Sequence, residues 1–395
     1  MKFFALACVT AALLLATPST QAAQTLRQQV DQRGDFVLIG NTGGWDCNPG
    51  GGIPAPIVGA IGACGTNVND TAIDLLWRGD SPAAGQAAAN NTITPAQARS
   101  TAVLAIPAGA SITYARLYWA ASNNTIGTTV TLEHPISAFT TVLTADVSYA
   151  GTLAGGTTAA YEASADITTL VQTQGLGAYR VGNIPMINPV GLNDSVNFVA
   201  WSMVVFYALP SDPPRNLALF DGFDLISGGV PSSATISGFL VPNAGFSGHL
   251  GLITYEGDAS IVGDQFSFGG VFLSDAQNPV NNFFNGTRSL LGLPVTVVGD
   301  LPQLSGAPAS MLTFDLDTID VTARLVAGQT SATIAANSTG DVYALGAFVT
   351  SISTLKPVFT NTQKTFVDLT GAGGIYPGDL IEYTITTSNT GSDTG

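Results

Sequence analysis

Short runs of alternating apolar and polar residues recur along this chain, and turn-forming residues separate them. Alternation with a period of two indicates β-strands, because successive side chains of a strand point to opposite faces of the sheet. The pattern predicts strands at residues 102–106, 113–120, 128–133, 198–208, 216–220, 234–241, 249–255, 265–273 and 343–352. Helical periodicity is almost missing, so we expect an all-β fold of tandem β-sandwiches, of immunoglobulin-like or jelly-roll type.

Three stretches fit this pattern less well. Residues 24–32 predict one short helix or an N-terminal arm. Residues 167–172 and 321–326 are ambiguous between a strand and a single helical turn.

A weak internal repeat relates the two halves of the chain. Pro107 follows a predicted strand and precedes Leu117 by ten residues, and Pro242 precedes Leu252 by the same ten. Both members of the second pair lie 135 positions after their counterparts. The repeat predicts two related sandwiches in tandem.

The offset of the repeat grows further along the chain. Asp166 begins one apolar run and Asp320 begins its counterpart, 154 positions later. The larger offset predicts an insertion in the second half, at residues 274–309. The proline cluster at residues 210–214 is the expected boundary between the halves.

Two alternatives to tandem sandwiches stay open. Any two all-β stretches show echoes of this kind. The runs at 206–207 and 219–220 also flank the proline cluster like the two arms of one hairpin, which would join the halves into a single unit.

The N-terminus predicts a secretory signal peptide at residues 1–22. Lys2 is followed by an apolar run that ends at Ala16, and Thr20 and Ala22 form a small-x-small cleavage site. The run is too short for a membrane anchor, and no other stretch approaches the required length. We therefore expect a secreted protein, in the medium or on the outer cell surface, with no membrane insertion within this chain.

Two cysteines, Cys47 and Cys64, remain after cleavage at that site. Exported chains pass through an oxidising compartment, so we expect a disulfide that closes a glycine- and proline-rich loop. A metal or redox pair is the alternative, but the spacing matches no zinc or C-x-x-C pattern. Residues 23–100 are therefore expected to be a loop-rich region that packs on the first sandwich.

The composition narrows the choice of partners. Charged residues make up only 10% of the chain, and the net charge is -15 with a pI of about 4.2. An acidic surface repels nucleic acid and anionic membranes, so neither is expected as a partner.

The last forty residues carry several motifs in order: Lys364-Thr365, Asp368, Pro377-Gly378-Asp379, an alternating strand at 380–385, and Asn389-Thr390-Gly391. In this order they resemble the DUF11-type conserved repeat, an immunoglobulin-like sandwich found in tandem on large bacterial surface proteins. The family's later strands and its aspartate-proline turn are absent. The resemblance implies that residues 356–395 are the start of a truncated repeat, and that the chain is the N-terminal piece of a longer protein.

Residues 35–355 resemble the N-terminal region of secreted DUF11-containing surface proteins of gram-negative gliding bacteria. The segments that carry this resemblance are residues 37–42, 115–119, 201–207, 215–222 and 278–285. It implies an adhesion, matrix or gliding-associated role, with cell-surface or matrix components as partners, and no catalytic residues. The predicted layout is a signal peptide at 1–22, the loop-rich region at 23–100, sandwiches at 101–212 and 213–355, and the repeat from 356.

Acidic residues suggest calcium as a candidate ligand. Asp315 and Asp317 alternate with apolar neighbours, so a strand would place both carboxylates on its solvent face, with Asp320 just beyond. Glu256, Asp258 and Asp264 form a second cluster around a glycine turn. Calcium prefers six to eight oxygen ligands. Neither cluster has an EF-hand spacing, so a solvated acidic surface is the alternative, and we expect no cofactor other than this candidate calcium.

Two loops suggest binding. Arg78-Gly79-Asp80 matches an integrin-type attachment motif, in which an extended loop presents a guanidinium and a carboxylate; chance occurrence is the alternative. Trp45 and Trp77 also lie in predicted loops, where an exposed ring would stack on a sugar. These tryptophans are the one indication of glycan binding.

Enzymatic chemistry finds little support. A serine nucleophile needs a base within hydrogen-bond reach, and the chain has only His134 and His249. No G-x-S-x-G elbow is present. The leading hypothesis is a non-enzymatic structural or adhesion protein, followed by a calcium-dependent carbohydrate-binding module and then by a secreted hydrolase.

Overall fold

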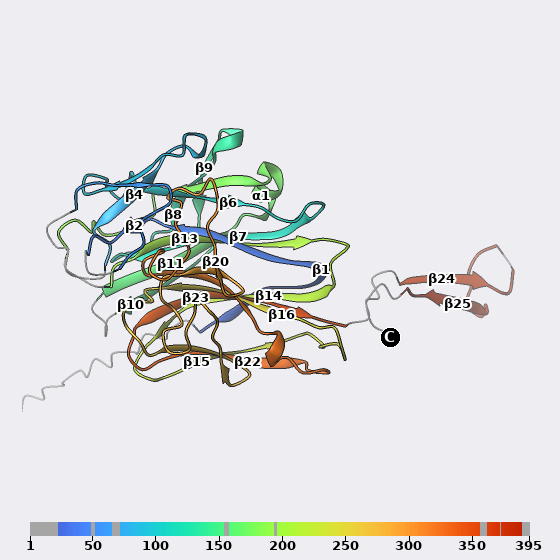
Figure 1. The fold of residues 1–395 in the computed structure, drawn as a ribbon. Helices are drawn as coiled ribbons and strands as arrows, with labels where there is room; N and C mark the ends of the chain where they lie inside the picture. The colour runs from blue at the N-terminus through green and yellow to red at the C-terminus, as the bar shows by residue number, and fades with distance from the viewer. Residues whose placement is uncertain are drawn as a thin grey trace, which may run out of the picture.

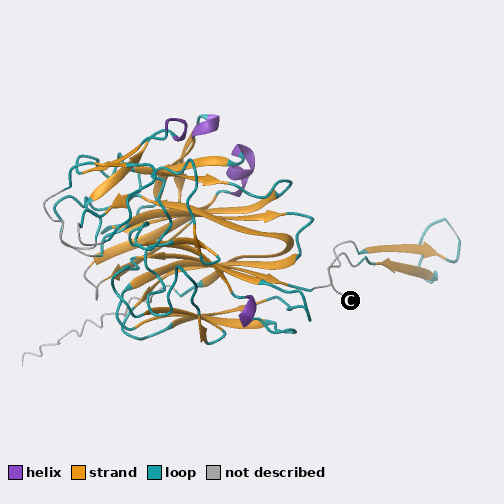
Figure 2. Ribbon diagram, viewed as in Figure 1, coloured by secondary structure: helices purple, strands orange, loops and turns teal. Residues whose placement is uncertain are grey.

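The computed structural model describes residues 23–48, 52–64, 72–153, 158–192, 196–355, 362–371 and 373–388. Nearly all of its elements are strands, so the all-β sandwich prediction is confirmed (Figures 1 and 2). The expected signal peptide at residues 1–22 lies outside the described residues. Within the described part, no helix is long and apolar enough to cross a membrane.

The first half of the chain forms an eight-stranded jelly roll. Its strands are β1 (Thr25–Thr42), β6 (Arg99–Leu104), β7 (Ser111–Ser122), β8 (Thr129–His134), β9 (Phe139–Thr144), β11 (Thr158–Asp166), β12 (Gly177–Gly182) and β13 (Val199–Ala208). The first of these strands pairs with the eighth, the second with the seventh, the third with the sixth and the fourth with the fifth. This nested pairing is the jelly-roll topology, so it decides between the two sandwich types expected.

The second half repeats this topology strand for strand. Its strands are β14 (Pro214–Ile226), β15 (Ser232–Ser237), β16 (Gly248–Tyr255), β17 (Asp264–Phe268), β18 (Val271–Phe272), β21 (Phe314–Asp320), β22 (Ser331–Ser338) and β23 (Tyr343–Ser353). Leu117 and Leu252, related by the sequence repeat, lie on the two third strands. Asp166 and Asp320 end the two sixth strands, before α1 (Thr168–Gln174) and the 3-10 turn η3 (Thr322–Arg324).

Strand β1 belongs to both jelly rolls. Residues 25–33 pair with β14, and residues 34–42 pair with β13. The prediction of a helix or arm at residues 24–32 is therefore wrong, because this segment is part of a strand. β13 and β14 are not the arms of one hairpin, since β1 lies between them and links the two inner sheets into one eleven-stranded order.

Four sheets stack in layers around three cores. Each jelly roll has an inner sheet, which contains its first strand, and an outer sheet. The two inner sheets face each other across a core that we call the seam, where Tyr118 and Tyr255 are buried. Trp119 and Trp201 fill the outer core of the first jelly roll, and Phe348 contributes to that of the second. The β7 residues in these two cores alternate, so this strand is covered on both faces.

The connection from β1 to β6 extends the outer sheet of the first jelly roll. It contains β2 (Gly44–Trp45), β3 (Ala60–Ile61), β4 (Leu75–Gly79), the 3-10 turn η1 (Pro82–Ala84) and β5 (Ala87–Asn90). Isolated bridges join it and β6 to the second half, at Val58 with Gln303 and at Thr101 with Leu301. This region is therefore a contact between the jelly rolls as well as an extension of a sheet.

Both jelly rolls also carry an addition beside the sixth strand. β10 (Val147–Leu153) pairs with β11, and the 3-10 turn η2 (Pro135–Ser137) precedes β9. In the second half, residues 273–313 contain β19 (Arg288–Leu290) and β20 (Leu293–Pro294), and β19 runs parallel to β21. The larger second addition occupies the place where the growing offset predicted an insertion.

Beyond residue 361 the structure describes one hairpin, β24 (Gln363–Asp368) and β25 (Ile381–Thr386), which stands apart from the sandwiches in Figure 1. Its apolar side chains are exposed, among them Phe366, Tyr383 and Ile385. Asn389-Thr390-Gly391 lie outside the described residues. An immunoglobulin-like repeat here stays a prediction.

Candidate functional site

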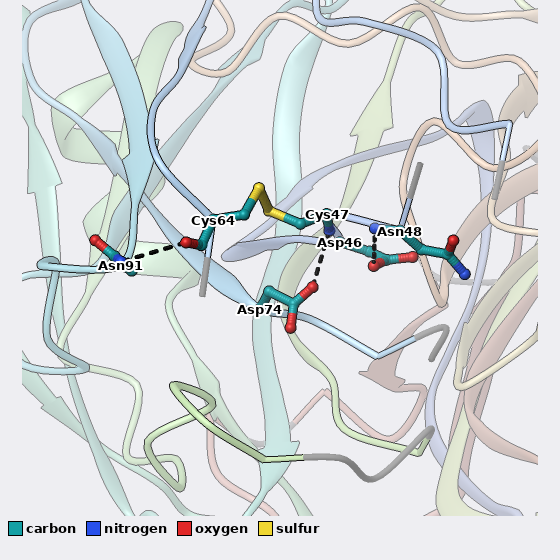
Figure 3. Close-up of a disulfide and its surroundings, with 6 residues drawn as sticks. All are labelled: Asp46, Cys47, Asn48, Cys64, Asp74 and Asn91. Atoms are coloured by element: carbon teal, nitrogen blue, oxygen red, sulfur yellow. Dashed lines mark hydrogen bonds between the residues drawn. A yellow bond between two sulfur atoms is a disulfide. The ribbon is translucent and has the colours of Figure 1, made fainter. Parts of the chain in front are cut away.

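The predicted disulfide is present. Cys47 and Cys64 are bonded, with their Cα atoms 5.9 Å apart (Figure 3). The Asp74 carboxylate accepts a hydrogen bond from the Cys47 amide at 3.1 Å, and the Asn91 side chain donates to the Cys64 carbonyl at 3.4 Å. These contacts fasten both ends of the loop to residues that flank β4 and β5, so the disulfide closes a loop within the extension.

The Arg78-Gly79-Asp80 motif begins on a strand, so the prediction of a loop is wrong, although the Arg78 side chain is exposed. Arg78 and Gly79 are the last residues of β4 and pair with β5. Arg78 donates to the Asp80 carboxylate at 3.1 Å, and Arg99 donates to the same oxygen. Burial raises the pKa of Asp80, but the hydrogen bonds from Arg99 and Arg78 outweigh it and lower the pKa overall. The carboxylate that a receptor metal would need is thus already paired within the fold.

Trp45 and Trp77 are buried, so the prediction of exposed stacking rings is wrong for both. They lie on the paired strands β2 and β4 and pack edge to face, with ring centroids 5.8 Å apart. Both rings belong to the core cluster that continues into the seam. The physical reason is that the loop-rich region forms additional strands and closes one end of that core.

The acids of β21 face the interior and not solvent, which corrects the calcium prediction. Asp315 and Asp317 are fully buried, because residues 273–313 fold over the face of β21 that would otherwise be exposed. The backbone amides of Asn285 and Thr287 each donate to Asp315 at 3.0 Å, and the Asn278 side chain donates to Asp317 at 2.8 Å.

Burial also changes the charge of this pair. It raises the pKa of Asp317 to about 7. Burial and then the neighbouring Asp317 raise the pKa of Asp315 well above its usual range. Asp320 lies apart, exposed, and its carboxylate accepts from the Thr322 amide at 2.8 Å. The three acids therefore do not form one open site.

The second acidic cluster is also interior. Glu256, Asp258 and Asp264 are buried, and burial raises the pKa of Asp264 to about 6. Asp341, which sequence reasoning missed, accepts from the Asp258 amide at 3.1 Å, and burial together with Asp258 and Asp264 raises its pKa to about 8. Within the described residues, no group of three or more His, Cys, Asp or Glu side chains is placed to hold a metal ion.

Both histidines are held by structural contacts. His134 Nδ1 lies 2.8 Å from the Ser137 hydroxyl, and its Nε2 lies 3.2 Å from the Leu176 carbonyl. His249 Nδ1 lies 3.2 Å from an Asp35 carboxylate oxygen. A serine hydrolase needs one histidine that joins a hydroxyl to a carboxylate, and neither set of contacts has that form.

A polar cluster in the seam had no counterpart in the predicted sites. Asp221 on β14 is fully buried and accepts two hydrogen bonds from Arg27, both at 2.9 Å, and one from the Tyr118 hydroxyl at 3.0 Å. Arg116 on β7 contacts Asp146 and the Ser164 hydroxyl. The cluster joins the two jelly rolls, because Tyr118 on β7 belongs to the first and Asp221 on β14 to the second.

Glu162 on β11 also points into the seam. Burial, with a further contribution from Asp221, raises the pKa of Glu162 to about 8. The facing residue on β23 is Gly346, where an added Cβ would lie 2.2 Å from a Glu162 oxygen. An arginine and a glutamate in the middle of apolar strands were the signal available in the sequence, since such residues are rarely buried without partners.

Comparison with known proteins adds little. No protein-family model matches the chain, and a search of curated proteins found no match. Among solved structures, the chain is similar at 12% identity to the major capsid protein P2 from bacteriophage PM2, over 65% of this chain and 92% of that one. The TM-score of that match is 0.17, which carries no argument about fold or function.

Proposed function

We propose that this protein is a non-enzymatic, secreted structural or adhesion protein of a bacterial cell surface. The observation that carries the proposal is the shared strand β1, whose halves lie in two different jelly rolls and tie them into one four-layer unit. A unit of this kind presents large, fixed surfaces. It suits display and attachment, which need rigidity and area and no reacting group.

Two features support an extracellular setting, and a third supports the truncated repeat proposed for residues 356–395. The N-terminal segment has the pattern of a signal peptide. A disulfide closes the loop-rich region, and disulfides persist in oxidising compartments. The hairpin β24–β25 carries apolar residues on a two-stranded element, which alone is marginally stable and is typical of part of a larger sandwich.

The resemblance to DUF11-containing surface proteins of gram-negative gliding bacteria belongs to this proposal. It adds a specific role in adhesion, matrix or gliding, with cell-surface or matrix components as partners. The acidic surface, with a net charge of -15, supports partners other than nucleic acid.

The proposal is tested in the bacterium that encodes the protein. An epitope tag placed in the hairpin turn at residue 374 is expected to be removed by protease added to intact cells, while a cytoplasmic marker survives. A strain that lacks the gene is expected to attach less to a solid surface, and the wild-type gene is expected to restore attachment. A tag that is protected in intact cells, or attachment unchanged by the deletion, contradicts the proposal.

A further inference from the structure

A cavity of about 700 Å³ opens at one end of the seam. The first jelly roll contributes the turn after β7 and parts of β10 and β11, and the second contributes β14 and the turn that leads to β15. Its volume lies in the range typical of small-molecule sites, which occur preferentially between domains.

The polar lining of this cavity is neutral. Its lining residues carry two amides and five hydroxyl groups, from Asn123, Asn124, Thr125, Thr152, Tyr161, Ser227 and Ser232. Among the described lining residues there is no Asp, Glu, Lys, Arg or His. In a chain with a net charge of -15, this neutral lining offers no counter-ion to a charged ligand.

The apolar part of the wall is built around a distortion of β14. The register between β14 and β23 shifts between Asp221 and Asp224, and Phe223 within the shift has a φ of 54°. A positive φ is uncommon for an aromatic residue. It turns the Phe223 ring into the cavity wall beneath Gly151, where an added Cβ would lie 3.4 Å from the ring. Bulges of this kind re-aim a side chain and are frequent beside binding sites.

We propose that this cavity binds a neutral, polyhydroxylated ligand, namely an uncharged glycan. Amides and hydroxyl groups both donate and accept hydrogen bonds. A sugar hydroxyl also donates and accepts, so each can be the donor or the acceptor in a hydrogen bond between the lining and the sugar. Ile126, Val230 and Pro231, which are exposed beside Phe223, supply an apolar surface for the C–H face of the ring. An acyl chain fits less well, because it would cover the amide and hydroxyl groups of the lining with a surface that offers them no hydrogen bonds.

This inference deepens the proposed function and rests on it, since it names the class of surface component to which the protein attaches. The site uses no metal and none of the tryptophans that the sequence suggested. It lies between the jelly rolls, so its shape depends on their fixed arrangement.

The test is calorimetric titration of the full chain with neutral tetrasaccharides of β-1,4-glucose, β-1,3-glucose, mannose and N-acetylglucosamine. Palmitate and an acidic galacturonate tetramer are the comparison probes. At least one neutral probe is expected to bind. Thr152→Trp, which places an indole at the exposed edge strand β10, is expected to abolish that binding. Thr140→Trp, at an exposed position on the edge strand β9 away from the cavity, is expected to leave it unchanged.

A milder variant covers the case in which the indole disturbs folding. Asn124→Ala removes one amide from the lining and is expected to weaken binding roughly 3- to 10-fold, as for the loss of one hydrogen bond. Equal unfolding midpoints confirm that both variants fold.

Any of three results overturns the glycan site. No neutral probe binds, Thr152→Trp leaves binding intact, or the protein prefers palmitate or the acidic probe. If the glycan site is overturned but the gene is still needed for surface attachment, only this inference is contradicted. If the protein binds a glycan but is found inside the cell, only the proposed function is contradicted.

Discussion

At the scale of single residues, the Glu162 side chain points into the seam, where neither Arg27 nor Arg116 forms an ion pair with it. Arg27 and Arg116 lie in the same seam, but they already contact Asp221 and Asp146. An ionised Glu162 would therefore add uncompensated negative charge to the interior, which is costly. Burial raises the pKa of Glu162 to about 8, so its carboxyl group is protonated at neutral pH.

This protonation makes stability depend on pH. Because the pKa of Glu162 is higher in the folded state than its ordinary value of 4.5, the stability that the protonated group supports is present in acid and is lost as pH rises through about 8. Glu162→Gln mimics the neutral form. We expect the wild type to lose roughly 3–5 kcal/mol more than the variant between pH 5 and pH 9. Urea unfolding at both pH values measures the difference.

The matched control for this variant is Glu382→Gln, at an exposed position of the hairpin. It is expected to leave the pH profile unchanged. Some slope is expected to remain in Glu162→Gln, because burial also raises the pKa of Asp317 to about 7 and of Asp341 to about 8. Equal slopes for Glu162→Gln and the wild type would show that Glu162 is ionised in the folded protein.

Asp221 is the opposite case, a buried carboxylate with its own cation. Asp221→Asn removes the charge that pairs with Arg27 on the neighbouring strand β1 and, at 3.8 Å, with Arg116 across the seam. Removing one partner of a buried pair leaves the other uncompensated, so we expect a loss of about 3–5 kcal/mol in the free energy of unfolding. Thermal and urea unfolding at pH 7 measure it.

Asp224→Asn is the control on the same strand. Asp224 is also buried, but it accepts from the Ser232 hydroxyl at 2.7 Å and from the Gln24 amide at 3.3 Å, with no arginine. An asparagine there is expected to cost less than about 1 kcal/mol. Similar losses at both positions would refute a special role for the Arg27 pair.

Residue-scale sequence reasoning failed where a face was covered by a distant segment. Alternation correctly placed Asp315 and Asp317 on one face of a strand, but it carried no information about what covers that face. Residues 273–313 cover it with amide and hydroxyl donors. Trp45 and Trp77 were wrongly placed in loops because the sequence around them lacks a clear alternation, although both lie on strands.

At the scale of elements, alternation predicted strands in many regions where they occur but missed others. The strands of the inner sheets are covered on both faces, and such strands read as continuous apolar or small-residue runs. β11 is an example, with alanines at four of nine positions. β1 was missed for a different reason. Its first half is polar, and it is a strand because β14 offers a free edge there.

The disulfide is the element-scale feature best predicted from sequence, and its contribution can be measured. Cys47 and Cys64 are 17 positions apart. A closed loop of this length is worth about 3 kcal/mol in the chain-entropy model. Cys47→Ala combined with Cys64→Ala is expected to lower the free energy of unfolding by about that amount.

The same pair provides an internal control. Dithiothreitol is expected to lower the unfolding midpoint of the wild type and leave that of the double alanine variant unchanged. A double variant as stable as the oxidised wild type would show that the loop is held by the contacts of Asp74 and Asn91 alone.

At the scale of the whole molecule, the two jelly rolls share a strand, a polar cluster and a core. A weak sequence repeat indicated two equivalent halves, but it did not predict that the halves share a strand and a core. The order β13-β1-β14 depends on pairing between residues roughly 160 to 195 positions apart. The periodicity of a short stretch of sequence carries no information about such distant contacts. The cavity at the seam was out of reach for the same reason, because both halves contribute its walls.

Sharing of this extent predicts cooperative unfolding. If one jelly roll unfolded alone, the other would lose half of β1 or its partners and would expose the inner face buried at the seam. That exposure costs about 25 cal/mol for each Å² of apolar surface. Differential scanning calorimetry of residues 23–395 is therefore expected to give one transition, with equal van't Hoff and calorimetric enthalpies.

A local variant sharpens this test. Gly34 lies where β1 passes from β14 to β13, with a φ of 136°, and an added Cβ would lie 1.9 Å from the Tyr207 carbonyl oxygen. Gly34→Ala is expected to lower the single midpoint without splitting it, because the strain acts on both jelly rolls. Gly109→Ala, in a turn where the nearest atom to an added Cβ is 3.9 Å away, controls for backbone strain alone. Two separate transitions in the wild type would instead mean that each jelly roll is stable alone and that β1 links two independent domains.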